Sequence, residues 1–85
     1  MEAKSLIEFN QNESGIIQTV TGSLHLKRRL LDLGFTKGSK IKVVNISPLK
    51  NSFLLEIHGY ILALRQNAVK NILVVKAWRR KIVKK

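Results

Sequence analysis

The chain has 85 residues, of which 45% are hydrophobic and 25% charged, and it contains no cysteine. This length and composition indicate one folded domain with a modest core, and they exclude a disordered chain, a disulfide framework and a thiolate metal site. The formal net charge of +11 favours a polyanionic partner, but six of the cations lie in residues 76–85 without an acid, and subtracting those six leaves +5 for residues 1–75.

Two β patterns precede the first helical pattern. Ser5–Phe9 predicts a short first strand, and Gly15–Thr21 predicts a second, because β-branched residues are concentrated there and a glycine follows. The N-terminal residues lack a basic region followed by a long apolar run, and no stretch approaches the roughly 20 apolar residues of a membrane span. We therefore expect a cytoplasmic protein.

The helical pattern lies between Ser23 and Gly34. Leu26, Leu30 and Leu33 recur at i, i+4 and i+7, which is the spacing of one buried helix face. Ser23 is a suitable N-cap, and Gly34 stands where a helix ends in the left-handed conformation that glycine adopts without steric cost. The spacing predicts one helix over residues 23–33, which is too short to be stable by itself.

A strand period replaces the helix period after Gly38, which makes a turn into Lys40–Ile46. The apolar phase slips between Val43 and Val44, and such a slip indicates a bulge or the strong bend of a small barrel. Phe35 follows the helix stop, at the position that usually folds back over the last helical turn.

The C-terminal half continues with a predicted hairpin. Its strands are Phe53–His58 and Tyr60–Arg65, with the corner at Gly59. Gln66–Lys70 predicts a single helical or 3₁₀ turn, and Ile72–Val75 predicts a last strand.

Five or six short strands and one helical insertion have few ways to bury their apolar faces in so short a chain. We predict a mainly β fold, a small SH3-like β-barrel of five or six strands with one short inserted α-helix. The competing arrangement is an α+β sheet with the helix packed across one face. The predicted core consists of Ile16, Val20, Leu26, Leu30, Leu33, Ile41, Val43, Leu55, Ile57, Leu62, Leu64, Ile72 and Val74.

No catalytic or metal-binding constellation is present in the sequence. Gly34–Lys40 resembles a phosphate loop, but three residues separate its glycines where the Walker pattern needs four, and the lysine follows the serine instead of preceding it. His25 and Asp32 lack a third ligand, His58 is a lone histidine at a strand end, and the acids are scattered over separate elements. We therefore expect no enzyme, no metal site and no cofactor.

The segment KRRLLDLGFTKGSKIKVVNISPLKNSFLLEIHGYILALR carries an ordered set of positions. These are Leu30, the helix stop Leu33-Gly34, the turn glycine Gly38, the turn Pro48-Leu49 and the strand end Leu64-Arg65. The set resembles the FeoA family of bacterial ferrous iron transport accessory proteins over about residues 15–75.

Two positions depart from the family pattern. Members usually have proline before the turn glycine, where this chain has Lys37, and glycine after the Pro-Leu pair, where it has Lys50. The second change leaves Asn51 as the residue best suited to positive φ in that turn. Neither departure alters the fold prediction.

The resemblance implies a cytoplasmic module without catalytic residues that acts with FeoB, the membrane transporter carrying a GTP-binding domain, in ferrous iron uptake. The same fold also occurs as a domain of iron-dependent repressors, so contact with another protein chain is the shared theme. Among the motif residues, Leu30, Gly34, Gly38, Pro48 and Leu64 fit core packing and turn geometry. Arg65, at a strand end, is the motif position most available to a partner.

The basic tail KAWRRKIVKK, residues 76–85, follows the predicted domain of residues 1–75. As a helix it would place Trp78 on an apolar face, and such a segment fits an anionic membrane surface at the inner side of the membrane, beside the transporter. Nucleic-acid phosphates attract the same charges, so a small basic barrel that binds nucleic acid is the alternative function. A solvated C-terminus is the third interpretation. The candidate partner-binding residues are Arg65, Lys76, Trp78, Arg79, Arg80 and Lys81.

Overall fold

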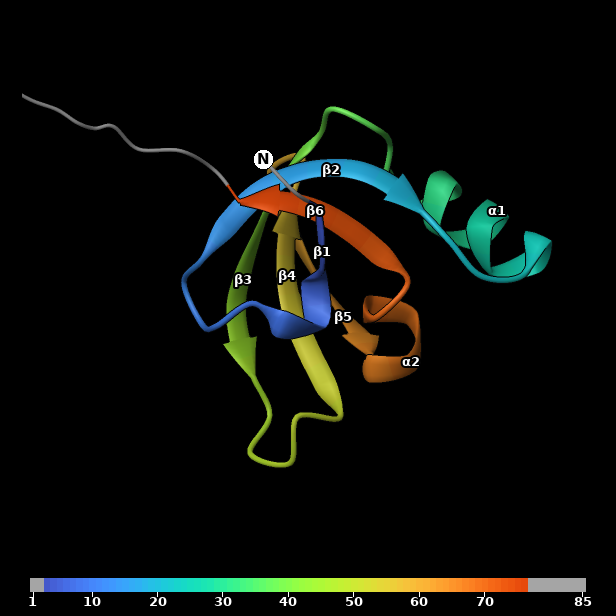
Figure 1. Cartoon of the computed structure of the whole chain (residues 1–85). Coiled ribbons are helices and arrows are strands. Elements are labelled where there is room, and N and C mark those ends of the chain that lie inside the picture. The colour runs from blue at the N-terminus through green and yellow to red at the C-terminus, as the bar shows by residue number, and fades with distance from the viewer. Residues whose placement is uncertain (1–2, 77–85) are drawn as a thin grey trace, which may run out of the picture.

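The computed structural model describes residues 3–76, which form a bent six-stranded antiparallel sheet with one nine-residue helix and two short helical turns (Figure 1). In chain order the elements are β1 (Lys4–Ser5), the 3₁₀ helix η1 (Leu6–Glu8), β2 (Ser14–Val20), α1 (Leu24–Asp32), β3 (Lys40–Ile46), β4 (Ser52–Ile57), β5 (Tyr60–Arg65), α2 (Gln66–Val69) and β6 (Ile72–Lys76). Sheet neighbours follow the order β1-β6-β2-β3-β4-β5, so β1 and β5 are its edges.

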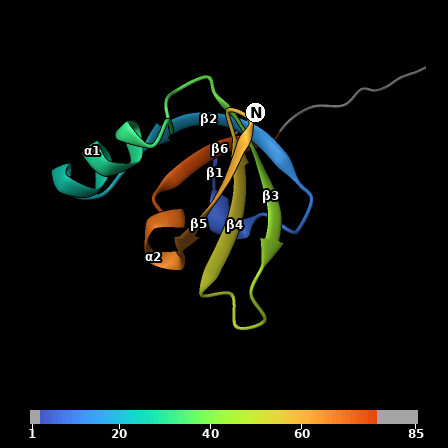
Figure 2. The same cartoon turned by 180° about the vertical axis from the view of Figure 1, so that it is seen from behind.

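This arrangement confirms the predicted SH3-like fold with one inserted helix. The sheet curves around its own core, and α1 projects beyond the end of β2 instead of crossing a sheet face (Figures 1 and 2), so the competing α+β arrangement is wrong. The predicted bulge in β3 is also confirmed, because the pairing of β3 with β4 shifts between Val43 and Asn45. Such an irregularity bends the strand and increases its twist, which helps a small sheet to curve.

The N-terminal segment differs from the predicted strand Ser5–Phe9. Only Lys4–Ser5 pairs with β6, and a 3₁₀ helix follows, capped by the Ser5 hydroxyl, which accepts a hydrogen bond from the Ile7 amide at 3.3 Å. Leu6 and Phe9 are both buried. A period of three residues brings these two side chains to the same face, whereas strict strand alternation would place them on opposite faces.

The predicted inward position of Ile16 in β2 is wrong. Ile16 is 38% exposed, whereas its neighbour Ile17 is 1% exposed. The pairing of β2 with β6 shifts between Ile17 and Thr19, which adds one residue to β2. Because of this bulge Ile17 and Val20 can both face the core although they are three residues apart.

The turn between β3 and β4 places its left-handed residue at Lys50, with φ of 59°, and not at Asn51 as predicted. Asn51 has another role, since its side-chain oxygen accepts a hydrogen bond from the Ser47 hydroxyl at 2.7 Å. Lys50 occupies the position where the family pattern usually has glycine, which explains why glycine suits that position.

The helix prediction is confirmed. Ser23 caps α1 by accepting a hydrogen bond from the Leu26 amide at 3.1 Å, and Gly34 ends the helix with φ of 101°. Leu30 is buried, and Phe35 folds back beneath the helix, where its amide donates to the Leu30 carbonyl at 2.9 Å. These contacts fix the C-terminal half of α1 to the barrel.

The core draws on all the strands except β1 and β5. It consists of Leu6, Phe9, Ile17, Val20, Leu30, Phe35, Ile41, Val43, Phe53, Leu55, Ile57, Val69, Ile72 and Val74. Four leucines predicted for the core are only partly buried: Leu26 of α1, Leu33 at its C-cap, and Leu62 and Leu64 of β5. The edge strand β5 and the projecting helix therefore share a half-covered apolar side of the molecule.

Candidate interaction groove

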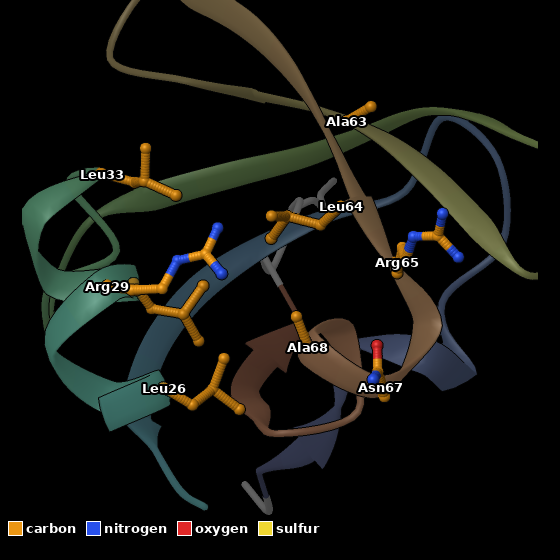
Figure 3. Close-up of a pocket in the computed structure, with 9 residues that line it drawn as sticks. Leu26, Arg29, Leu33, Ala63, Leu64, Arg65, Asn67 and Ala68 are labelled. Carbon is orange, nitrogen blue, oxygen red and sulfur yellow. The ribbon is translucent and has the colours of Figure 1, made fainter. Parts of the chain in front are cut away.

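A groove of about 360 Å³ lies between α1, the edge strand β5 and the short helix α2 (Figure 3). Three segments that are distant in the sequence meet there. The lining residues are Leu26, Arg29, Leu30, Leu33, Ala63, Leu64, Arg65, Asn67 and Ala68. A volume of this size is at the lower end of the range for ligand pockets, so it suits a few side chains of a partner better than a whole cofactor.

The groove combines an apolar floor with two cations. Leu26 and Leu33 face it from α1 and Leu64 faces it from β5, while the guanidinium of Arg29 points into the space between them (Figure 3). Arg65 extends away from α1 at the outer side of β5. No carboxylate lines the groove. The lining therefore favours a ligand that presents both apolar and negatively charged groups.

The β4–β5 turn contacts the C-terminal end of α1. His58 Nε2 lies 2.9 Å from the Gly34 carbonyl oxygen and 3.4 Å from the Ser39 hydroxyl. Because a carbonyl only accepts, Nε2 is the donor in the first contact. The Tyr60 hydroxyl donates to the Leu33 carbonyl. The Leu33 carbonyl belongs to the C-cap of α1, and a helix end leaves such a carbonyl without an intrahelical partner. The Gly34 carbonyl also accepts a hydrogen bond from the Thr36 amide at 2.9 Å.

Sequence reasoning missed the roles of His58 and Tyr60. His58 is not at a strand end but in a two-residue turn with Gly59, and both residues have positive φ, at 52° and 83°. This is the geometry of a type I′ hairpin turn. The alternation of the two strands predicted the hairpin, but no local signal indicates that its tip contacts a helix end.

The structure brings four of the predicted motif residues into the groove: Leu30, Leu33, Leu64 and Arg65. Gly34 and Gly38 are turn residues with positive φ, at 101° and 90°. The β3–β4 turn that contains Pro48 lies at the other end of the molecule from α1 (Figures 1 and 2). The motif is therefore a mixture of groove residues and turn residues.

Of the predicted partner-binding residues in the tail, only Lys76 is among those described. Lys76 ends β6, and its ammonium lies 2.6 Å from a carboxylate oxygen of Glu13. The remaining four, Trp78, Arg79, Arg80 and Lys81, lie outside the described residues, as does most of the predicted tail of residues 76–85.

The Glu13–Lys76 pair predicts a small pH dependence of stability. The Asn10 amide, which donates to Glu13 at 2.7 Å, and then Lys76 lower the pKa of Glu13 below its ordinary value of 4.5. A lowered folded-state pKa stabilises the fold at pH above the ordinary value, and this contribution is lost as the pH falls through the lowered value. Because both side chains are partly exposed, we expect Glu13→Gln to remove less than about 1 kcal/mol.

Urea unfolding at pH 7 and at pH 3 checks this expectation. The Glu13→Gln variant should lose stability relative to the parent at pH 7 and match it more closely at pH 3. Glu8→Gln is the matched control, since Glu8 is exposed and forms no ion pair within residues 3–76. Equal losses at both pH values would contradict the assigned role of the Glu13 charge.

Residues 3–76 offer no group of three histidine, cysteine, aspartate or glutamate side chains placed to hold a metal ion. In the same residues, no helix has the length and apolar character needed to span a bilayer.

Residues 4–76 match the family model of the FeoA domain. A FeoA-like protein from Clostridium acetobutylicum has a TM-score of 0.86 at 22% identity, over 98% of this chain and 96% of that one. Stenotrophomonas maltophilia FeoA, an SH3 domain protein complexed with zinc, has a TM-score of 0.72 at 27% identity, over 82% of this chain and 87% of that one. A manganese-dependent transcriptional repressor has a TM-score of 0.82 at 18% identity, over 88% of this chain but 37% of its own. No curated protein matches the chain.

Proposed function

The chain belongs to the FeoA domain family, and on that premise we propose that it is an accessory module of bacterial ferrous iron uptake that binds the GTPase-bearing transporter FeoB at the cytoplasmic side of the membrane. The structurally similar Stenotrophomonas maltophilia FeoA is described as a candidate activating factor of ferrous iron transport, which supports this role. The observation that carries the proposal is the groove between α1, β5 and α2. It is a formed surface that lacks catalytic groups and is suited to a protein segment.

The groove offers binding energy without a large rearrangement of the module. Leu26, Leu33 and Leu64 are only partly covered in the free chain, so a partner side chain that covers them removes apolar surface from water, at about 25 cal/mol per Å². Arg29 and Arg65 would add charge complementarity, which contributes more to specificity and to association rate than to affinity. The module thus acts by binding its partner in the groove, and it catalyses no reaction itself.

The alternative function, nucleic-acid binding, has less support in residues 3–76. A barrel that binds single-stranded nucleic acid usually presents exposed aromatic side chains on which bases stack. Phe9, Phe35 and Phe53 are buried in the core, and the hydroxyl of the one exposed aromatic residue in the described part of the chain, Tyr60, is bonded to the end of α1. The net charge of +11 is the remaining argument for this alternative.

Co-purification with the transporter tests the proposal. The full chain, immobilised, is incubated with detergent-solubilised bacterial membranes that contain a FeoB-type transporter, and retained proteins are identified by mass spectrometry. We expect the transporter to be retained, and we expect Arg29→Glu combined with Arg65→Glu to reduce retention roughly tenfold or more, because two charge contacts become repulsive. Lys42→Glu, at an exposed position of β3 that does not line the groove, is the control and should retain the transporter.

Two results would contradict the proposed function. One is the absence of the transporter among proteins retained by the parent chain. The other is retention that is abolished by nuclease treatment, which would favour the nucleic-acid alternative.

A further inference from the structure

The strand β5 is an edge of the sheet, and the groove lies along it. β5 pairs with β4 from Ser52↔Arg65 to Ile57↔Tyr60, and no other strand of the described residues pairs with β5. An edge strand presents unpaired backbone amides and carbonyls that can receive another strand. Natural proteins usually cover such an edge or protect it against pairing with another chain. An edge strand that lies beside an apolar groove is therefore a candidate site for strand addition.

The pairing pattern identifies which backbone groups of β5 point outward. A two-residue hairpin turn makes Ile57 and Tyr60 a hydrogen-bonded pair, and such pairs alternate with non-bonded ones along an antiparallel ladder. The groups of Tyr60, Leu62 and Leu64 therefore face β4. The bond from the Gln66 amide to the Asn51 carbonyl, at 3.0 Å, agrees with this phase.

By the same alternation, the amides and carbonyls of Ile61, Ala63 and Arg65 point away from β4. No backbone hydrogen bond within residues 3–76 outside the regular elements uses the amides of these three residues or the carbonyls of Ile61 and Ala63. The Arg65 carbonyl is engaged otherwise, because Arg65 is the N-cap of α2 and an N-cap carbonyl accepts the first bond of its helix. The outer edge of β5 thus offers three amides and two carbonyls, on three residues spaced two apart, to an added strand. This number suits a partner segment of about five or six residues, the usual length of a strand.

The side chains around the edge define what the added strand would carry. Leu64 points toward α1, where Leu26 and Leu33 face it, whereas Ala63 and Arg65 point to the other face of β5 (Figure 3). Directly opposed residues of antiparallel strands place their side chains on the same face. A segment paired with β5 would therefore carry apolar side chains on the groove face and a residue opposite Arg65 on the outer face.

We propose that β5 receives an extended, acidic segment of the partner protein as a seventh, antiparallel strand. Its alternate apolar side chains enter the groove, and its carboxylates lie opposite Arg65 on the outer face. This inference rests on the proposed function and deepens it, since it gives the mode of docking and the chemistry of the docked segment.

Charge favours such a partner over a second copy of this chain. The sequence of β5, YILALR, contains no acid, so a symmetric pairing of two β5 strands would bring no carboxylate to Arg65. The groove lining contributes Arg29 and Arg65 and no carboxylate. A docked segment with carboxylates on its outer face neutralises Arg65, whereas self-pairing leaves Arg65 uncompensated.

The test uses a synthetic octapeptide of alternating glutamate and valine, titrated into the full chain and followed by amide chemical shifts of β5. We expect saturable binding with shifts at Ile61, Ala63 and Arg65. The matched control is an octapeptide of alternating lysine and valine, which has the same β propensity and the opposite charge. We expect the lysine–valine peptide to bind about fivefold more weakly than the glutamate–valine peptide, which is the effect of losing one exposed charge contact.

Backbone methylation of the peptide separates strand addition from other modes of binding. In an antiparallel added strand the amides of the glutamates, which share the face of Arg65, point at β5, and those of the valines point away. N-methylation of the glutamates should abolish binding, whereas N-methylation of the valines should leave it within about threefold, since no hydrogen bond is lost. Equal effects of the two methylations would overturn the proposal.

A matched pair of chain variants tests the same edge from the other side. Ala63→Pro removes one outward amide without removing a β4–β5 hydrogen bond, and proline is tolerated on an edge strand with that orientation. We expect it to weaken peptide binding about three- to tenfold, the value of one hydrogen bond, while Ala63→Val should not. If Ala63→Pro fails to fold by circular dichroism, the methylated peptides decide the question.

The outcome is distinguishable from that of the transporter experiment. Peptide binding with the expected pattern supports strand addition to β5 even if the transporter is not retained. In that case the proposed partner is wrong and the proposed mode of docking stands. Retention of the transporter without peptide binding overturns the mode alone. A dimer of the parent chain in solution that Ala63→Pro converts to monomer would show that a second copy occupies the edge, and would also overturn the proposal.

Discussion

Replacing Leu30 by alanine is expected to lower the free energy of unfolding by about 2 to 5 kcal/mol, the range for a buried leucine. Leu30 is 1% exposed and is the one side chain of α1 that enters the core. Its loss leaves a cavity between α1, Phe35 and the barrel, and the same residue forms part of the groove floor. A measurable fraction of unfolded chain at room temperature would follow in so small a domain.

Leu31→Ala is the matched control for this prediction. Leu31 is the adjacent residue of the same helix, and it is 50% exposed. Its truncation should change the unfolding free energy by about half a kcal/mol or less, as for ordinary surface positions. Urea melts of the two variants provide the comparison. Similar losses for Leu30→Ala and Leu31→Ala would show that the assigned orientation of α1 is incorrect.

Gly34→Ala is expected to destabilise the fold more than Gly38→Ala, although both glycines have positive φ. The backbone strain of a left-handed alanine costs about 1 to 2 kcal/mol at either position. At Gly34 a methyl group would also lie 2.8 Å from the ring of His58, whereas at Gly38 it would meet nothing within 4 Å. Such overpacking adds about 1 to 3 kcal/mol.

A double-mutant cycle isolates the part of this cost that comes from the hairpin contact. His58→Ala alone should lose the hydrogen bond to the Gly34 carbonyl, worth about 0.5 to 1.5 kcal/mol. In the presence of His58→Ala, Gly34→Ala should cost little more than Gly38→Ala, since only strain remains. Additive effects of Gly34→Ala and His58→Ala would show that the two residues are not coupled.

The contact between the hairpin turn and α1 also links stability to the groove. α1 forms one wall of the groove and β5 the other, and His58 and Tyr60 connect the two at one end. A variant that frees the end of α1 is therefore expected to weaken binding of the glutamate–valine peptide as well as stability. The Gly38→Ala variant should leave peptide binding unchanged, because Gly38 does not line the groove.

Local patterns in the sequence were sufficient to determine several features of this protein. The cap Ser23, the leucine spacing and the stop at Gly34 predicted α1 within one residue at either end, because capping, helical period and helix termination all act over a few residues. The bulge in β3 and the β4–β5 hairpin were predicted for the same reason. An ordered set of such features, from Leu30 to Arg65, was enough to indicate the family.

The face that β2 presents to the core was decided by its partner strand. Ile16 and Ile17 are adjacent and chemically identical, so strict alternation allows either one to face inward. The extra residue in the pairing of β2 with β6 selects Ile17 together with Val20. Nothing in residues 14–20 alone specifies that pairing.

The groove, too, exists only in the tertiary structure. The sequence predicted Leu26, Leu33 and Leu64 to be core residues. Hydrophobic spacing indicates which face of an element is apolar, but it does not indicate how completely that face is covered in the folded protein. They remain partly exposed because α1 leaves the sheet, where His58 and Tyr60 hold its end across 24 and 27 residues of sequence. The curvature of the folded sheet brings the hairpin turn to the end of the helix, and no pattern of neighbouring residues predicts that contact.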